Sequence, residues 1–117
     1  MTASLIIAVD GPAASGKGTI AARLAALYSL PHLDTGLLYR AVGLGVLDAG
    51  GSLADVAAAE TVARALDASH LVDTERLTDR GAGEAASRIA GYPGVRAALL
   101  AFQKAFAAQP GGAVLDG

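Results

Sequence analysis

A glycine-rich segment near the N-terminus carries residue types that bind phosphate groups. It fits the pattern G-x-x-x-x-G-K from Gly11 to Lys17, and Thr19 follows two positions later. In such a loop the backbone N–H groups point inward around an anion, and the N-terminus of the following helix adds partial positive charge. The lysine supplies a full charge for the β- and γ-phosphates of a nucleotide. The predicted nucleotide-binding residues are Gly11, Pro12, Ala13, Ala14, Ser15, Gly16, Lys17, Gly18 and Thr19.

The hydroxyl at Thr19 is a candidate ligand for the Mg²⁺ that accompanies a nucleotide, either directly or through water. Gly18 occupies the place where this pattern usually has a serine or threonine, so direct ligation is less certain than in the usual pattern. The alternative interpretation is an ordinary glycine-rich turn between a strand and a helix, with an exposed lysine.

A second group of polar residues begins at Thr35. Gly36 and Arg40 are four residues apart and share one helix face, so a hydroxyl at the helix N-terminus lies one turn from a guanidinium. That arrangement can receive a small phosphate, which the arginine can bind with two hydrogen bonds. The alternative is structural: Thr35 or Asp34 caps the helix, Tyr39 packs in the core and Arg40 is solvated.

The elements that would position these residues alternate between strands and helices. Ser4–Asp10 is a continuous β-branched apolar run, which predicts a strand buried on both faces of a parallel sheet. Thr19–Tyr28 has helical spacing, and Leu30-Pro31 is expected to end that helix. His32–Asp34 and Ala113–Asp116 are expected as further strands. This alternation favours a parallel α/β architecture.

The rest of the chain is expected to be mostly helical, with one weakly patterned segment. Ser52 is the expected N-cap of the third helix, and the segment Ala68–Gly83 is expected to be a loop with an extended piece near Leu71-Val72. The expected helices are Thr35 to about Asp48, Ser52 to about Asp67, Glu84–Ala90, and a last helix carrying the apolar stripe Val95, Leu99, Phe102 and Phe106.

Composition excludes several classes of protein. The 117 residues allow one domain at most, and 53% hydrophobic with 17% charged residues argues against disorder. A net charge of −2 disfavours nucleic acid as a partner, and no apolar run approaches the roughly 20 residues of a membrane span. The chain has no cysteine, and no signal peptide is evident, so we expect a cytoplasmic protein.

The remaining charged residues carry weaker expectations. Asp116 ends a strand, where an aspartate can face Mg²⁺ and nucleotide, and the alternative is a purely structural role. Neither histidine, at positions 32 and 70, has a partner at metal-ligand spacing, so both are expected to be structural. The arginines expected to be solvated are Arg64, Arg76, Arg80 and Arg88.

Together these segments resemble the nucleoside monophosphate kinases and, among them, the cytidylate kinase family. The run G-P-x-x-S-G-K-G-T is followed by L-D-T-G-L-L-Y-R-A, which is similar to the cytidylate pattern D-[ST]-G-x-x-Y-R. A second block agrees: A-A-S ends at Ser87, P-x-V-R ends at Arg96, and Q-x-x-F begins at Gln103. The last strand, Val114–Gly117, resembles the family's strand that ends in V-x-D-G.

The resemblance implies a three-layer P-loop NTPase fold with a parallel sheet, and transfer of the γ-phosphoryl of ATP to CMP or dCMP with Mg²⁺. Lys17 and Arg40 would be the catalytic residues. A cytoplasmic monomer acting on small molecules, with neither nucleic acid nor membrane as partner, is expected. The substrate-binding residues implied by the resemblance are Thr35, Gly36, Tyr39, Arg40, Ser87 and Arg96.

The family's chains are longer, and this sequence lacks several of their parts. The Arg-Asp pair expected after Gly117, an arginine-rich lid and a later base-reading aspartate do not occur in it, and Ala68–Gly83 is shorter than the family's usual insert. We therefore expect an N-terminal portion of a kinase. Its expected parts are an ATP-binding segment at 1–34, a mostly helical monophosphate-binding region at 35–110 and a core strand at 111–117.

Two other functions stay open from the sequence. One is a different small-substrate kinase of adenylate or shikimate type, and the other is a nucleotide-binding fragment without turnover. A GTPase is disfavoured, because no N-K-x-D segment is present to read guanine.

Overall fold

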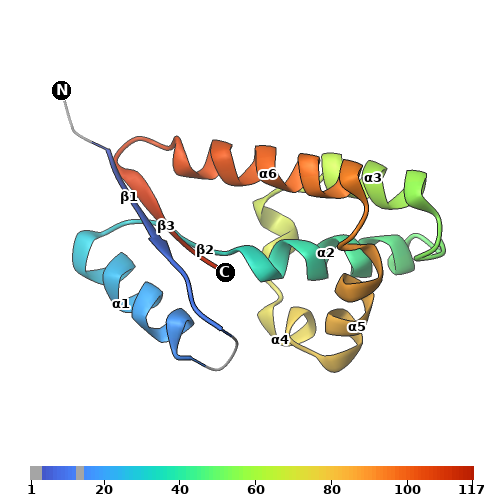
Figure 1. The fold of residues 1–117 in the computed structure, drawn as a ribbon, viewed down its shortest axis with the longest axis horizontal. Helices are drawn as coiled ribbons and strands as arrows, with labels where there is room; N and C mark the ends of the chain where they lie inside the picture. The colour runs from blue at the N-terminus through green and yellow to red at the C-terminus, as the bar shows by residue number, and fades with distance from the viewer. Residues whose placement is uncertain (1–3, 13–14) are drawn as a thin grey trace. The chain divides into compact units, whose positions relative to one another are not determined.

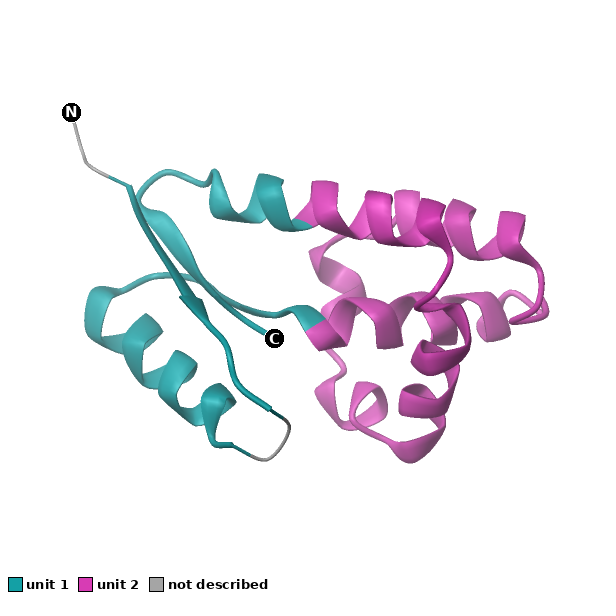
Figure 2. Cartoon of the chain, viewed as in Figure 1, with its two compact units in different colours: residues 1–35, 103–117 teal, residues 36–102 magenta. Residues whose placement is uncertain are grey.

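The computed structural model describes residues 4–12 and 15–117 (Figure 1). The chain forms two compact units, which Figure 2 distinguishes by colour. The first unit contains residues 1–35 and 103–117, and the second contains residues 36–102. Each is described below by itself.

The first unit is built on a three-stranded parallel sheet. Its strands are β1 (Leu5–Val9), β2 (His32–Asp34) and β3 (Gly112–Asp116), in the order β1-β3-β2. The last strand in sequence is therefore the middle strand in space, with Val9 and Asp34 both opposite Asp116. The parallel α/β architecture expected from the alternating elements is confirmed.

The expectation that the first strand is buried on both faces is wrong for the described chain. β1 pairs with β3 on one side only, and the side chain of Ile6 is 56% exposed. Ile7 and Val9, which alternate with Ile6, pack against the cluster formed by Ala21, Ala25 and Val114. A continuous apolar run cannot by itself distinguish a strand covered on both faces from one covered on a single face.

Helix α1 (Lys17–Tyr28) begins two residues before its expected start. It ends at Tyr28 because Ser29 adopts a left-handed conformation, from which its N–H reaches the carbonyls of Ala25 and Ala26. The end at Tyr28 agrees with the predicted helix Thr19–Tyr28, and the turn at Ser29 precedes Leu30-Pro31. Alanines at positions 21 and 25 form its buried face.

The second unit is helical, and α2 and α6 each continue into the first unit by part of their length. The stripe expected on the last helix is buried at Val95 and Leu99 and half-buried at Phe102 and Phe106. The helices are α2 (Thr35–Asp48), α3 (Val56–Arg64), α4 (Thr74–Leu77), α5 (Arg80–Ile89) and α6 (Pro93–Ala107), with a 3-10 turn at Ala68–Leu71.

The N-cap expected at Ser52 is wrong, because the cap of α3 is Asp55. The Asp55 carboxylate accepts a hydrogen bond from the N–H of Ala58, whereas the Ser52 hydroxyl accepts one from the N–H of Ala54 in the preceding turn. Both residue types favour such bonds to nearby N–H groups. The helix that follows ends at Arg64, three residues before its expected end.

The loop and extended piece expected between Ala68 and Gly83 are also wrong. This segment holds the 3-10 turn, α4 and the first turn of α5. The carboxylates of Asp67 and Asp73 accept hydrogen bonds from the N–H groups of Ser69 and Arg76, which starts the two short helical turns. The polar residues that suggested a loop act instead as helix caps.

No described helix is long and apolar enough to cross a bilayer.

Gly112 is the residue on which the central strand pairing depends most closely. Its φ is 107°, and a Cβ there would overlap the carbonyl oxygen of Leu5 on the paired strand. Its neighbour Gly111 also has a positive φ, 89°, but open space surrounds the position of a Cβ. A side chain at Gly111 would therefore cause backbone strain alone, whereas one at Gly112 would cause both strain and a steric collision.

We expect Gly112→Ala to lower the free energy of unfolding by about 3 kcal/mol or more, because strain and collision add. Gly111→Ala should cost about 1–2 kcal/mol, from the left-handed conformation alone. Denaturant unfolding of both variants measures the difference. Equal costs would show that β1 and β3 do not approach each other as closely as described.

Candidate functional site

The glycine-rich segment joins the end of β1 to the start of α1 in the first unit. The Ser15 N–H donates to the carbonyl of Pro12 at 3.2 Å, and Gly16 is the N-cap of α1 with φ 84°. Among the described residues no side chain caps this helix start, and a helix start of this kind favours an anion. Ala13 and Ala14 lie outside the described residues.

Lys17 is the first residue of α1, with Gly18 and Thr19 after it in the same turn. The three residues are thus close to the helix N-terminus, where anions are favoured. Thr19 is exposed, so its hydroxyl is accessible to a ligand. Gly11 and Pro12 are exposed as well.

Asp116, at the end of β3, is the buried acid of this site, with its side chain 1% exposed. Its Oδ1 lies 3.8 Å from Nζ of Lys17 and has no hydrogen-bond partner within the described residues. Its Oδ2 accepts a hydrogen bond from Nε2 of His32. The end of the sheet therefore combines one buried carboxylate, one ammonium and one imidazole.

The contact of His32 with Asp116 was missed by sequence reasoning, which gave that histidine no partner. The two residues are 84 positions apart in the chain. The strand register places Val114 opposite His32, so the aspartate lies two residues further along the neighbouring strand. Pairing of the second and third expected strands is the signal that could have found this contact.

Thr35 begins α2, directly after β2. A Cβ at Gly117 would overlap its Oγ1, so the hydroxyl lies against the backbone at the end of β3. The Gly117 N–H in turn donates to the carbonyl of Val9 at 3.4 Å. Thr35 thus lies at the same sheet end as Lys17 and Asp116. Gly36, the next residue of α2, is exposed and belongs to the second unit.

Arg40 is not a solvated charge, as its alternative interpretation had it. Its Nη1 donates to the carbonyl of Leu77 at 3.0 Å and to that of Asp79 at 3.3 Å, at the corner between α4 and α5. A Cβ on Gly83 would come within 3.2 Å of Nη2, so the guanidinium lies close over the first turn of α5. The remaining N–H donors of the guanidinium make no hydrogen bond to a described residue, so they can bind a ligand.

Ser87 lies one turn after Gly83 on α5, and its hydroxyl donates to the Gly83 carbonyl at 3.1 Å. The structure thus brings Arg40 and Ser87 to the same glycine. Arg96 is exposed on α6 and forms no ion pair within the described part of the chain. Tyr39 is half-buried on α2.

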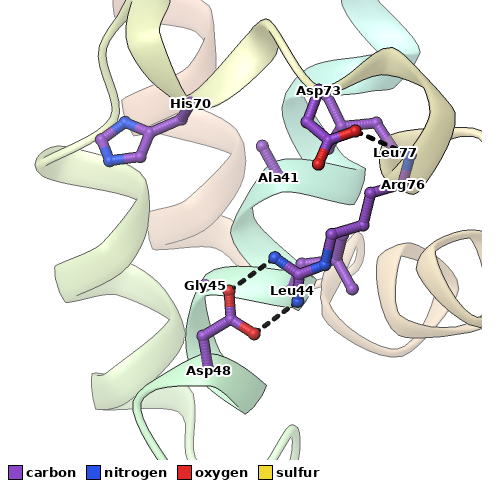
Figure 3. Close-up of a pocket in the computed structure, with 8 residues that line it drawn as sticks. All are labelled: Ala41, Leu44, Gly45, Asp48, His70, Asp73, Arg76 and Leu77. Carbon is purple, nitrogen blue, oxygen red and sulfur yellow. Dashed lines mark hydrogen bonds and ion pairs between the residues drawn. The ribbon is translucent and has the colours of Figure 1, made fainter.

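A small cavity of about 80 Å³ lies elsewhere in the second unit. Across it Arg76 donates to both carboxylate oxygens of Asp48, at 2.8 and 2.5 Å, and Figure 3 shows this two-pronged pair. Both side chains are about half exposed. The residues that line the cavity are Ala41, Leu44, Gly45, Asp48, His70, Asp73, Arg76 and Leu77.

The arginines expected to be solvated are exposed, but three of them are paired. Arg64 and Arg80 form ion pairs with Glu60 and Glu84, each four residues away on the same helix. Such exposed pairs contribute little to stability. Arg76 differs because it joins α4 to α2 across a longer distance in sequence.

The hydrogen bonds from Arg76 lower the pKa of Asp48 below its usual value of 3.8, and the nearby positive charge acts in the same direction. Desolvation opposes this shift. The pKa of Arg76 is correspondingly raised, first by its hydrogen bond to Asp48. The folded chain therefore favours the ionised pair.

Nearly the whole of this chain is similar in sequence to known proteins. The sequence model described as "Cytidylate kinase" matches residues 7–117. A cytidylate kinase of Caulobacter vibrioides is 66% identical over 112 residues, which are 96% of this chain and 52% of the relative. Those of Methylobacterium sp. and Xanthobacter autotrophicus are 65% and 66% identical over 113 residues, 97% of this chain and 53% of each relative. The chain spans about half the length of the curated relatives it matches.

The Asp48–Arg76 pair predicts a pH-dependent contribution to stability. Because the folded-state pKa of Asp48 is lowered, the contribution is present above pH 3.8 and is lost as pH falls through the folded pKa. We expect Asp48→Asn to unfold at lower denaturant concentration than the unaltered chain at about pH 7, and the difference to vanish in strong acid.

A suitable control for this comparison is Glu75→Gln, which changes the net charge equally at a residue that forms no ion pair within the described residues. It should not reproduce the effect. A stability difference for Asp48→Asn that stays constant into strong acid would contradict the assignment.

Proposed function

The chain belongs to the cytidylate kinase family, and we propose that it provides the ATP site and the monophosphate site of such an enzyme. The proposed reaction transfers the γ-phosphoryl of ATP to CMP or dCMP, giving CDP or dCDP and ADP. The observation that carries this proposal is the ammonium of Lys17 at the uncapped start of α1, next to the buried carboxylate of Asp116.

The start of α1 supports the ATP part of the proposal. Backbone N–H groups around Gly16, together with the amine of Lys17, would hold the β- and γ-phosphates. The proposed cradle runs from Gly11 to Thr19, and its described residues are exposed, except for the half-buried Lys17, which leaves them accessible to a nucleotide. Lys17 would counter the negative charge that shifts among phosphate oxygens during transfer.

The second unit supports the acceptor part. Arg40 is held by two carbonyls through a single nitrogen, which leaves its other donors for a phosphate. Ser87 contacts the same glycine as this guanidinium, and we propose that the two bind the monophosphate together. Arg96, Thr35, Gly36 and Tyr39 are proposed to complete the acceptor site.

The oxygen donors near Lys17 fit Mg²⁺. The hydroxyl of Thr19 is accessible, and Oδ1 of Asp116 is an unpartnered carboxylate oxygen within the described residues. Both are hard oxygen donors of the type that Mg²⁺ takes, directly or through water. When bound with ATP, the ion would neutralise phosphate charge. Arg40 and Arg96 would do the same on the acceptor and hold it in line.

The proposed setting follows the sequence expectations. We propose a cytoplasmic monomer that acts on small molecules and not on nucleic acid, in keeping with a net charge of −2. In the proposed organisation, residues 1–34 bind ATP, residues 35–110 bind the monophosphate, and residues 111–117 form the core strand.

Substrate preference tests the proposed function directly. We expect the chain to bind ATP, and to bind CMP and dCMP at least about tenfold more tightly than AMP or shikimate. Isothermal titration measures each affinity, and a coupled assay of ADP release measures turnover. A preference for AMP or shikimate would overturn the proposal, and binding of both nucleotides without ADP release would restrict it to nucleotide binding.

The contact of Arg40 with Gly83 gives a more local test of the acceptor site. Gly83→Ala should push the guanidinium from its position by a few tenths of an ångström, because the new Cβ would lie 3.2 Å from Nη2. We expect the affinity for CMP to fall about three- to tenfold. Titration calorimetry with CMP measures this.

The matched control is Gly81→Ala on the same helix. Its Cβ would meet only Oδ2 of Asp79, at an ordinary 3.6 Å. Both changes raise helix propensity by a similar amount, so a general effect on α5 would appear in both. If both variants bind CMP as the unaltered chain does, Arg40 does not hold the phosphate.

A further inference from the structure

His32 is a polar residue of the first unit that the proposed reaction does not use. It begins β2, and its side chain is 28% exposed. Its Nε2 hydrogen-bonds Oδ2 of Asp116, whose side chain is 1% exposed. A carboxylate so deeply buried is stable only where its charge is paired and hydrogen-bonded. The imidazole therefore gives Oδ2, one of the two carboxylate oxygens, its hydrogen bond.

The second carboxylate oxygen of Asp116, Oδ1, lacks such a hydrogen bond within the described residues. Oδ1 of Asp116 has no hydrogen-bond partner within the described residues, and the Nζ of Lys17, at 3.8 Å, is beyond hydrogen-bond distance. Leaving a buried polar oxygen without a hydrogen bond is costly. Such a cost is often retained at sites where the free group has a function.

The orientation of this carboxylate depends on the histidine. With Oδ2 held by His32, the carboxylate cannot rotate freely, and Oδ1 is directed to the lysine. Without that bond, both oxygens would be free to turn, and the lysine would have no fixed partner. The imidazole thus acts on the ammonium through the aspartate and does not itself touch it.

We propose that His32 is a positioning residue for nucleotide binding: it fixes Asp116 so that the carboxylate holds the Lys17 ammonium at the start of α1. The inference rests on the proposed role of Lys17 in binding phosphate. A preset ammonium loses less conformational entropy when the nucleotide binds. The phosphates then take the ammonium as their own partner, which its 3.8 Å separation from Oδ1 permits.

The test measures the affinity of the 117-residue chain for ATP by titration calorimetry. His32→Leu should weaken binding about tenfold, which corresponds to about 1.4 kcal/mol. His32→Gln places an amide N–H near the position of Nε2 and should stay within about threefold of the unaltered chain. His32→Asn is too short to reach and should behave as His32→Leu does.

A double-mutant cycle separates positioning from general damage to the fold. In a Lys17→Ala background, His32→Leu should weaken ATP binding no further, because the group it acts through is gone. A variant that only lost stability would still weaken binding in both backgrounds. His70→Leu, in the second unit, is the control for loss of an imidazole and should bind ATP normally.

The outcomes separate this inference from the proposed function. If Lys17→Ala binds weakly but His32→Leu and His32→Asn bind as the unaltered chain does, the inference is wrong and the cradle stands. If Lys17→Ala binds ATP normally, the proposed cradle is wrong and the inference falls with it. Should His32→Leu fail to fold, the contrast between His32→Gln and His32→Asn decides, since equal affinities would overturn the inference.

Discussion

The structure depends on the position of β3 between β1 and β2. Its five residues pair in parallel with strands from the first 34 residues, so the two ends of the described chain form one sheet. Only a residue without a side chain can begin this strand, because the Leu5 carbonyl occupies the space next to Gly112. This pairing places Asp116 at the end of the sheet where α1 begins.

The chemistry of the first unit follows from this position of Asp116. A helix N-terminus favours anions, and an uncapped one presents N–H groups without partners. Asp116 adds a negative charge beside this positive end, but it is buried, lies 3.8 Å from the ammonium of Lys17 and accepts a hydrogen bond from His32. The proposed phosphate site therefore combines positive groups at the helix start with a carboxylate that stays buried.

The sequence predicted those parts of the molecule that depend on neighbours in the chain. The helix after the glycine-rich segment, the helix Thr35–Asp48 and the last strand all carry local signals, and the structure has these three elements. Local patterns do not decide which of several polar residues caps a helix, so they predict Ser52 where the cap is Asp55. For the same reason they predict a loop in Ala68–Gly83, where aspartates cap short helical turns.

The features that the sequence did not predict depend on contacts between distant residues. The exposure of Ile6 depends on which strands and helices lie beside β1, and the partner of His32 depends on the register of β2 with β3. The carbonyls of Leu77 and Asp79, which accept hydrogen bonds from Arg40, lie more than 35 residues from it in the sequence. Composition and spacing along the chain do not show which distant residues meet in the folded structure.

The central claim is that the start of α1 binds the phosphates of a nucleotide. Two-dimensional ¹H–¹⁵N spectra recorded while ATP is added to the chain test it most directly. The account predicts saturable shifts for the backbone amides of residues 15–19 and of Asp116, with the amides around Arg76 unchanged. Saturable shifts confined to residues 36–102, or none at all, would contradict it.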